Sequence, residues 1–143
     1  MKQITVSAQI TVFENTSELP EAILELMKAA VEIRKKAYAP YSGFRVGAAL
    51  LMEDGTVVVG NNQENADFTD GLCAERVALF YAHAKFPKVS VVAIAVSAKN
   101  HNGLVKEPAQ PCRSCRQVMV EFGVDMVVII TDQDGNIANE WTV

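Results

Sequence analysis

Apolar and polar residues alternate strictly from position 3 to position 12 of the chain. A two-residue period is typical of a strand with one buried face, so we expect a strand over residues 3–12. A helical spacing follows, because apolar residues recur every three or four positions between Leu19 and Ala37. Acidic residues near the start of this helix and basic residues near its end complement the helix dipole, and Pro40 stops it.

The rest of the pattern predicts further strands and helices in alternation. Residues 46–52 and 56–60 are apolar runs around Asp54 and Gly55, and an Asp-Gly pair in this position predicts a β-hairpin. Further elements are expected as helices over 72–84 and 112–122, buried strands over 89–97 and 125–131, and a short final strand. This order indicates one α/β domain over 1–143, a three-layer α/β/α sandwich with a central mixed sheet of about five strands and an extra N-terminal strand over 1–13.

Length and composition narrow the classes of protein that this chain can represent. Its 143 residues suit a single domain, and 50% hydrophobic with 21% charged residues is ordinary for a soluble protein. The net charge of -4 argues against a nucleic-acid partner, which would need a basic face. No apolar run approaches the length of a membrane span, and no signal peptide precedes the domain. We therefore expect a cytoplasmic protein without a membrane partner.

Three cysteines are the first candidates for chemistry: Cys73, Cys112 and Cys115. An odd number in a reducing compartment disfavours a disulfide framework and favours metal binding or catalysis. The C-x-x-C spacing of the last two, at a helix start, fits either half of a structural zinc site or a redox pair. His83 and His101 lack the spacing of a fourth ligand, so we expect His83 at the surface or in packing and His101 in solvent.

Three thiolates without a fourth protein ligand would leave an open coordination position, which is the arrangement of catalytic zinc. Arg76 lies one turn after the first cysteine and Arg116 directly follows Cys115, so both are candidates to donate to the sulfurs and offset their charge. Simple surface ion pairs are the alternative for these two arginines. Glu75, two residues after Cys73, is placed to reach a water on the metal and to act as a general acid and base.

Several separated motifs carry a resemblance to a known family. "CAER" followed by "PCRSC" resembles the signature of the zinc-dependent cytidine deaminases, in the short homotetrameric type with three cysteine ligands. "YAPYSGFRVGAALLMEDG", "GNNQENADF" and "CRQVMVEF" extend the resemblance over roughly residues 22–131. The resemblance implies one Zn²⁺ per chain, bound by Cys73, Cys112 and Cys115. It also implies that Glu75 moves protons between the water, N3 of the base and the leaving ammonia.

The same resemblance implies roles for five residues in substrate binding. The backbone N–H of Ala74 would hold O2 of the base, and the carbonyl of Gln110 would contact the leaving amino group. Asn62 and Glu64 would hold the ribose hydroxyls, and Phe44 would pack against the base. Without the resemblance, Asn62 and Glu64 fit an ordinary polar loop and Phe44 fits a core aromatic.

The implied function is hydrolytic deamination of cytidine and 2'-deoxycytidine to uridine and 2'-deoxyuridine, in pyrimidine salvage, by a homotetramer. A deaminase of another aminated pyrimidine nucleoside, such as blasticidin S, and a non-catalytic zinc-structured subunit remain the alternatives. Two positions depart from the family pattern: Arg113 stands where glycine is usual, and Phe68 replaces a tyrosine. We expect Arg113 in ordinary helical conformation, pointing away from the metal.

Overall fold

The computed structural model describes residues 1–5, 11–13, 15–102, 109–132 and 138–142. These residues form a six-stranded sheet in the order β1-β6-β5-β4-β2-β3, in which only the neighbours β4 and β5 are parallel. The strands are β1 (Thr11–Val12), β2 (Phe44–Met52), β3 (Val57–Asn61), β4 (Val91–Asn100), β5 (Val127–Thr131) and β6 (Ala138–Thr142). The predicted mixed sheet of five strands with an added N-terminal strand is confirmed.

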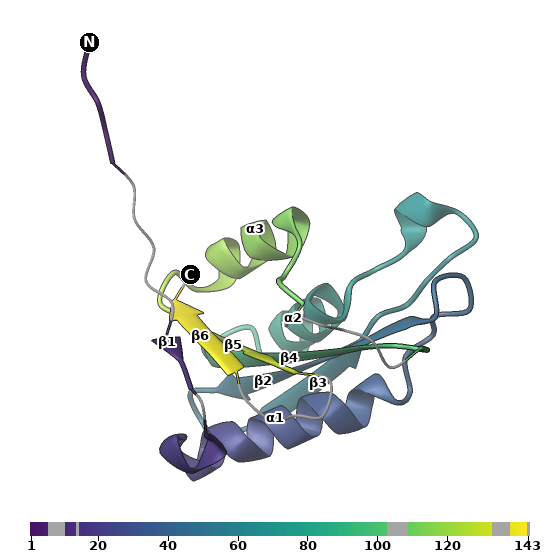
Figure 1. The fold of residues 1–143 in the computed structure, drawn as a ribbon, viewed down its shortest axis with the longest axis horizontal. Helices are drawn as coiled ribbons and strands as arrows, with labels where there is room; N and C mark the ends of the chain where they lie inside the picture. The colour runs from purple at the N-terminus through teal and green to yellow at the C-terminus, as the bar shows by residue number, and fades with distance from the viewer. Residues whose placement is uncertain (6–10, 14, 103–108, 133–137, 143) are drawn as a thin grey trace.

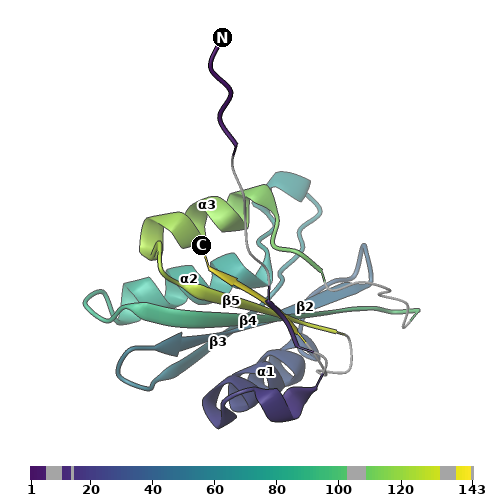
Figure 2. The ribbon, with the colours of Figure 1, turned by 60° about the vertical axis from the view of Figure 1, so that its left-hand side comes forward.

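Helices cover both faces of this sheet (Figures 1 and 2). Helix α1 (Glu21–Arg34) lies across one face, and α2 (Ala74–Lys85) and α3 (Arg113–Phe122) lie side by side on the other. Each interface has its own apolar core, one beneath α1 and one beneath α2 and α3. The three-layer α/β/α sandwich is therefore confirmed. Among the described helices, none has the length and apolarity needed to cross a membrane.

Two glycines let the helices approach the sheet very closely. A Cβ atom on Gly47 would lie 2.1 Å from the carbonyl oxygen of Ala30 in α1, and one on Gly60 would lie 2.5 Å from the backbone nitrogen of Ala78 in α2. Because backbone atoms cannot move aside cheaply, any side chain at these positions would push a helix off the sheet. The glycine in β3 thus fixes the height of α2, whose N-terminus carries the first cysteine.

The predicted elements between residues 16 and 131 are all present, with shifted ends. The hairpin turns at Gly55, which has φ +86°, a value that favours glycine. Helix α1 is shorter than the apolar spacing predicts: it begins after Pro20, and Ala37 lies in a turn in which its N–H bonds the Arg34 carbonyl at 3.0 Å. The chain then forms an isolated bridge between Tyr38 and Gln63, which leads it toward the site.

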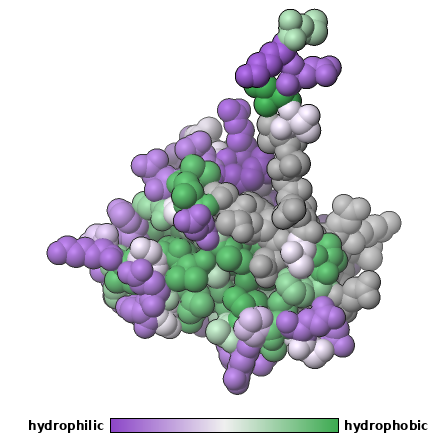
Figure 3. Space-filling model, turned by 90° about the vertical axis from the view of Figure 1, so that its left-hand side faces the viewer, coloured by the Kyte–Doolittle hydropathy of each residue, from purple (hydrophilic) through white to green (hydrophobic). Residues whose placement is uncertain are grey.

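The N-terminal strand is much shorter than its alternating pattern. Thr11 and Val12 pair antiparallel with β6, at the edge of the sheet, as expected of a strand that needs a partner. Residues 1–5 form no strand and stand clear of the rest of the molecule, fully exposed (Figures 1 and 3). The prediction of a strand from residue 3 is therefore wrong for 3–5, because these residues have no neighbouring strand to pair with, and positions 6–10 lie outside the described residues.

Candidate metal and active site

The three cysteines meet where the N-termini of α2 and α3 come together. Cys73 is the residue before α2, Cys112 the residue before α3, and Cys115 lies in the first turn of α3. Their sulfur atoms all lie within 4.8 Å of one another, with 3.9 Å between Cys73 and Cys112 and 3.4 Å between Cys112 and Cys115. Within the described part of the chain, no histidine or carboxylate joins this group. Three sulfurs with no fourth protein ligand are the donor set that the sequence predicts.

The ionisation of these thiols shows why a cation suits the cluster. The pKa of Cys73 is lowered to about 5, chiefly by a hydrogen bond with Cys115, with further help from Arg76. The pKa of Cys115 is raised, first by the same hydrogen bond, then by burial and by the negative charge of Glu75. Ionisation of one cysteine therefore disfavours ionisation of its neighbour, and a bound metal cation would stabilise several thiolates together. Thiolates at helix N-termini are the ligands that Zn²⁺ prefers, so the residues present fit zinc.

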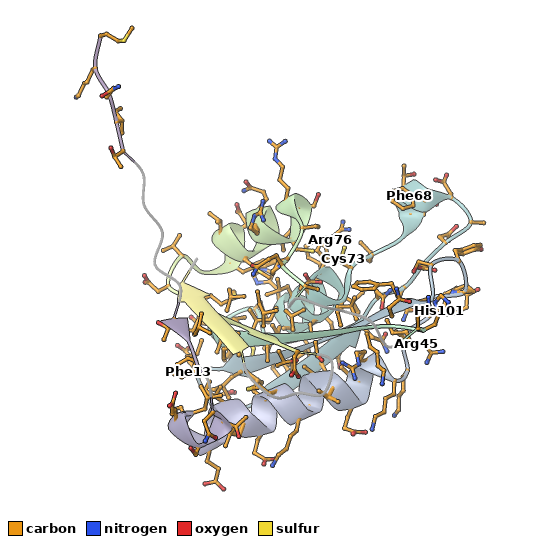
Figure 4. The ribbon with its side chains drawn as sticks, viewed as in Figure 1. Phe13, Arg45, Phe68, Cys73, Arg76 and His101 are labelled. Atoms are coloured by element: carbon orange, nitrogen blue, oxygen red, sulfur yellow. The ribbon has the colours of Figure 1, made fainter. Side chains whose placement is uncertain are left out.

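Arg76 is directed at this cluster from the first turn of α2 (Figure 4). Its Nη2 atom donates to the Cys73 sulfur at 3.6 Å, and its Nε atom is buried without a hydrogen-bond partner. The Cys73 contact raises the pKa of Arg76, so its charge is held next to the sulfur. Arg116 lies differently: its Nη1 atom donates to the carbonyl oxygen of Pro111 at 3.1 Å. Among the described contacts Arg116 has none with a sulfur, and it instead holds the loop that precedes the cysteine pair.

Glu75 is a buried carboxyl group beside the cysteines. It lies in the first turn of α2, is only 4% exposed, and lines the same cavity as Cys73 and Cys112. Burial raises its pKa, and the charge of Cys73 adds to this effect, while its backbone hydrogen bond and Arg76 oppose it. A carboxyl group with a raised pKa holds a proton more readily than an exposed one, as a group that accepts and passes on a proton must.

A cavity of about 900 Å³ opens above the cysteines and Glu75. Four of the five residues expected to bind substrate line it: Phe44, Asn62, Glu64 and Gln110. The fifth, Ala74, is completely buried and does not line the cavity with its side chain, although it lies between a cysteine and Glu75 at the start of α2. The fold thus gathers residues from the β2 start, the loop after β3 and both helix starts around one space.

Asn62 has a structural task that the sequence does not reveal. Its Nδ2 atom donates to the Phe44 carbonyl at 2.9 Å, and its Oδ1 atom accepts from the Val46 N–H at 2.8 Å. The side chain therefore continues the β2–β3 pairing beyond the end of the strand, in a residue that is 9% exposed. A second N–H on the amide remains for other partners. Asn62 is thus more than an ordinary polar loop residue, because it fixes the backbone on both sides of Arg45, directly after Phe44.

Glu64 is held in an ionised state by the turn that it faces. Its carboxylate accepts hydrogen bonds from the Ser42 hydroxyl and from the backbone N–H groups of Tyr41 and Ser42, at 2.9 and 3.2 Å for the latter two. The Ser42 hydroxyl bond is the main reason that the pKa of Glu64 is lowered. Ser42 and Tyr41 also line the cavity, and sequence reasoning missed both. Only the long-range contact with Glu64 identifies them.

The remaining sequence expectations concern residues outside the cavity. Arg113 is the first residue of α3 and is exposed, so it has the expected helical conformation. His83 is exposed on α2 and its ring lies against Phe122, with centroids 4.5 Å apart. His101 is exposed in the loop after β4. His83 therefore lies at the surface in a packing contact and His101 is exposed, as the sequence predicts.

Comparison with known proteins shows which family the chain belongs to. Residues 20–131 match the sequence model of the cytidine and deoxycytidylate deaminase zinc-binding region. The chain is 48% identical to a cytidine deaminase of Halalkalibacterium halodurans over 113 residues, which cover 78% of this chain and 81% of that protein. It is 42% identical to a cytidine deaminase of Sporosarcina psychrophila over 114 residues, 79% of each chain.

A solved structure gives the same result in three dimensions. The crystal structure of cytidine deaminase from Burkholderia pseudomallei superposes with a TM-score of 0.71 at 44% identity, and the match covers 80% of this chain and 88% of that one. The cytidine deaminase of Mycobacterium tuberculosis superposes with a TM-score of 0.63 at 36% identity, covering 73% and 80%. The matched regions contain all three cysteines, so the metal interpretation is favoured over a redox pair.

Proposed function

The chain belongs to the cytidine and deoxycytidylate deaminase zinc-binding family, and from this premise we propose that it hydrolyses cytidine and 2'-deoxycytidine. Water and the nucleoside give uridine or 2'-deoxyuridine and ammonia. The observation that carries the proposal is the buried Glu75 beside the three-cysteine donor set, on a cavity whose other wall holds the Glu64 carboxylate.

Zn²⁺ bound by Cys73, Cys112 and Cys115 would supply a Lewis acid that makes a water molecule acidic enough to react near neutral pH. Glu75 takes the proton of the attacking water and delivers it to N3 of the base. The water oxygen bonds to C4, and Glu75 then takes the remaining proton from that oxygen and passes it to the amino group. The C4–N bond breaks, ammonia leaves, and the oxygen becomes the C4 carbonyl of the product. Arg76 offsets the negative charge of the thiolates through its contact with Cys73. For Arg116 the equivalent contact with a sulfur stays a prediction.

Substrate recognition divides between the two ends of the cavity. Near the cysteines, the Ala74 N–H holds O2 of the base and the Gln110 carbonyl accepts from the amino group. Phe44 packs on the base, and Asn62 and Glu64 bind the ribose hydroxyls. The ionised state of Glu64 supports this role, because a carboxylate is a strong acceptor for hydroxyl donors.

Two observations weigh against the alternative functions. A zinc ion with a purely structural role would not require a carboxyl group to be buried beside it, because burial of a carboxylate is costly. A specialised deaminase of blasticidin S is not favoured, since the relatives reported above are all named cytidine deaminases.

We further propose that the enzyme is a homotetramer that works in pyrimidine salvage in the cytoplasm. An assembly is supported by Phe68, which is 95% exposed on the loop that protrudes beside the cavity (Figure 4). An aromatic side chain in that position would be buried usefully by a neighbouring subunit. Sedimentation equilibrium of the zinc-loaded protein tests this, and a monomer at micromolar concentration would contradict it.

The activity is tested by following ammonia release from cytidine, 2'-deoxycytidine, CMP, cytosine and adenosine under identical conditions. The proposal expects turnover of the two cytosine nucleosides, because the cavity presents acceptors for both the base and the sugar. Preferential turnover of the free base or of CMP would contradict the assignment of Asn62 and Glu64.

A further inference from the structure

A second cavity, of about 300 Å³, lies at the end of the sheet where β2 begins and β4 ends. We call it the basic pocket, and its lining residues are Arg34, Lys35, Gly43, Arg45, Lys99, Asn100 and His101. Four of these side chains are cationic, a fifth is a histidine, and none is a carboxylate. This concentration of positive charge occurs in a chain whose net charge is -4, so it needs an explanation.

The pairing of Arg45 with Lys99 is the clearest sign that the basic pocket is suited to an anion. The two residues are direct cross-strand partners in the antiparallel β2–β4 pair. Like charges directly opposite one another destabilise a sheet. Among the described residues, neither Arg45 nor Lys99 forms an ion pair with a carboxylate.

The other residues give the pocket a fixed shape. Arg34 is 5% exposed and donates to the Ser97 hydroxyl at 2.7 Å. This hydrogen bond fixes its guanidinium group on the buried side of the pocket. Arg45 donates from Nη1 to the Lys35 carbonyl at 2.7 Å, which leaves its other N–H groups for a ligand. Lys35 itself is paired with Glu32 at 2.5 Å and contributes less. Arg45 is therefore held at the pocket, with Lys99 directly opposite it on β4.

His101 completes the rim, at the same end of the sheet as Arg45 (Figure 4). Its backbone N–H bonds the Gly43 carbonyl at 3.1 Å, and its ring lies over that glycine. A Cβ on Gly43 would be 2.6 Å from Nδ1 of His101, and the φ of +65° also favours glycine. The absence of a side chain at Gly43 is thus what lets the imidazole line the pocket.

The basic pocket is separate from the catalytic cavity, although both use one segment. Ser42 and Phe44 line the catalytic cavity, while Gly43 and Arg45 line the basic pocket. Phe44 and Arg45 are successive residues of β2, so their side chains point to opposite faces of the sheet and the two cavities lie on opposite sides of the start of this strand.

We propose that the basic pocket binds a phosphate group, as inorganic phosphate or as the phosphoryl group of a small metabolite. A guanidinium and an ammonium group side by side match the charge and the several acceptor oxygens of a phosphate dianion. Bound phosphate would also neutralise the Arg45–Lys99 repulsion. Neither the metal cluster nor the proposed deamination is needed for this binding.

Isothermal titration calorimetry of the zinc-loaded full chain tests the proposal, with inorganic phosphate and glycerol phosphate as separate probes at constant ionic strength. We expect one site per chain with a Kd of about 1 mM or tighter. Tighter binding of inorganic phosphate identifies the free ion as the ligand, and tighter binding of the ester identifies a phosphorylated metabolite. Failure of both probes to bind overturns the proposal.

Arg45→Gln and Lys99→Gln should each weaken binding by about tenfold, the loss expected for a charge-assisted hydrogen bond. Lys88→Gln is the matched control, since it removes the same charge from an exposed position before β4, at the other end of that strand. Equal weakening by the control would show that phosphate binding depends only on the general charge of the protein. Displacement of phosphate by excess uridine would show that phosphate binds in the catalytic cavity. Either result would overturn the proposal.

The melting temperature provides a second test, because Lys99→Gln should weaken phosphate binding but stabilise the protein when phosphate is absent. In phosphate-free buffer, Lys99→Gln should raise it, because the substitution removes the like-charge pair. Addition of phosphate should then raise the melting temperature of the unmodified protein more than that of the variant. A lower melting temperature for Lys99→Gln in phosphate-free buffer would show that the pair is not repulsive, against the proposal.

Discussion

Replacing Glu75 should separate proton transfer from metal binding at positions only two residues apart. The three sulfurs form the donor group without Glu75, so Glu75→Gln and Glu75→Ala should each keep about one zinc per chain. Cys73→Ala removes one of three protein ligands and should lose the zinc and some stability. Glutamine keeps the shape of the side chain without its charge, so the melting temperature of Glu75→Gln should not fall.

The size of the effect on the rate follows from the position of Glu75. A positioned general acid or base contributes about 10²–10⁴-fold. Glu75 is 4% exposed, and in the proposed mechanism it acts on the water, on N3 and on the leaving group, so several steps should fail together when it is replaced. We expect the upper end of the range, a loss of about 5 kcal/mol in transition-state stabilisation. Glutamine should be nearly as inactive as alanine, because an amide cannot carry the proton.

The assay measures zinc by metal analysis and cytidine turnover by ammonia release on the same preparations. Formate adds a further test: it should restore part of the activity of Glu75→Ala, which leaves room for a small carboxylate, and none to Glu75→Gln. Loss of zinc from Glu75→Ala would make the glutamate a ligand. Zinc retained together with more than a tenth of the activity would assign the proton transfer to another residue.

Four further changes test the fold and the departures from the family pattern. Arg113→Gly should keep the zinc and lose less than about tenfold in kcat, because Arg113 is exposed in an ordinary helical position. Asn62→Ala should lower the free energy of unfolding by about 2 kcal/mol, since it leaves the Phe44 carbonyl and the Val46 N–H without their partner. Gly47→Ala should cost about 3 kcal/mol or more in denaturant unfolding, because its Cβ would meet the α1 backbone at 2.1 Å. Deleting residues 1–12 should lower the melting temperature through loss of the β1–β6 pairing, whereas deleting residues 1–5 should leave it unchanged.

Each of these changes has a clear contrary result. Loss of zinc from Arg113→Gly would make that arginine a necessary part of the metal site. An unchanged unfolding free energy in Asn62→Ala or Gly47→Ala would show that the close contacts are not maintained in solution. Equal melting temperatures for the two N-terminal deletions would show that the β1 pairing contributes nothing to stability.

The elements of the fold could be predicted where a local signal determines them. The Asp54-Gly55 turn and the two continuous apolar runs that became β4 and β5 were sufficient for the sheet. The ends of α1 could not be predicted from apolar spacing, because Ala37 is buried in a turn and not in the helix. The N-terminal strand shows the same limit, since alternation describes a face but does not supply a partner strand.

Some features of the site follow from local sequence motifs, and others depend on tertiary contacts. The spacing of the cysteines and the position of Glu75 are local features of the sequence, and they are sufficient to predict the metal cluster. The backbone contacts of Asn62 and the hold of Ser42 on Glu64 depend on loops more than 15 residues apart in sequence meeting in space. The Arg45–Lys99 pair is equally invisible in the sequence, because strand register decides it.

The meeting of two helix starts at the cysteines has a consequence for the stability of the whole domain. Cys73 and Cys112 lie 39 positions apart, and all of β4, the strand at the centre of the sheet, lies between them. A zinc ion that joins these residues acts as a cross-link that closes this loop. If it restricts the unfolded chain as a disulfide does, loop-closure entropy makes it worth about 4 kcal/mol. A chelator that removes the zinc would therefore break the cross-link between the two helix starts, and the domain would lose global stability together with its activity.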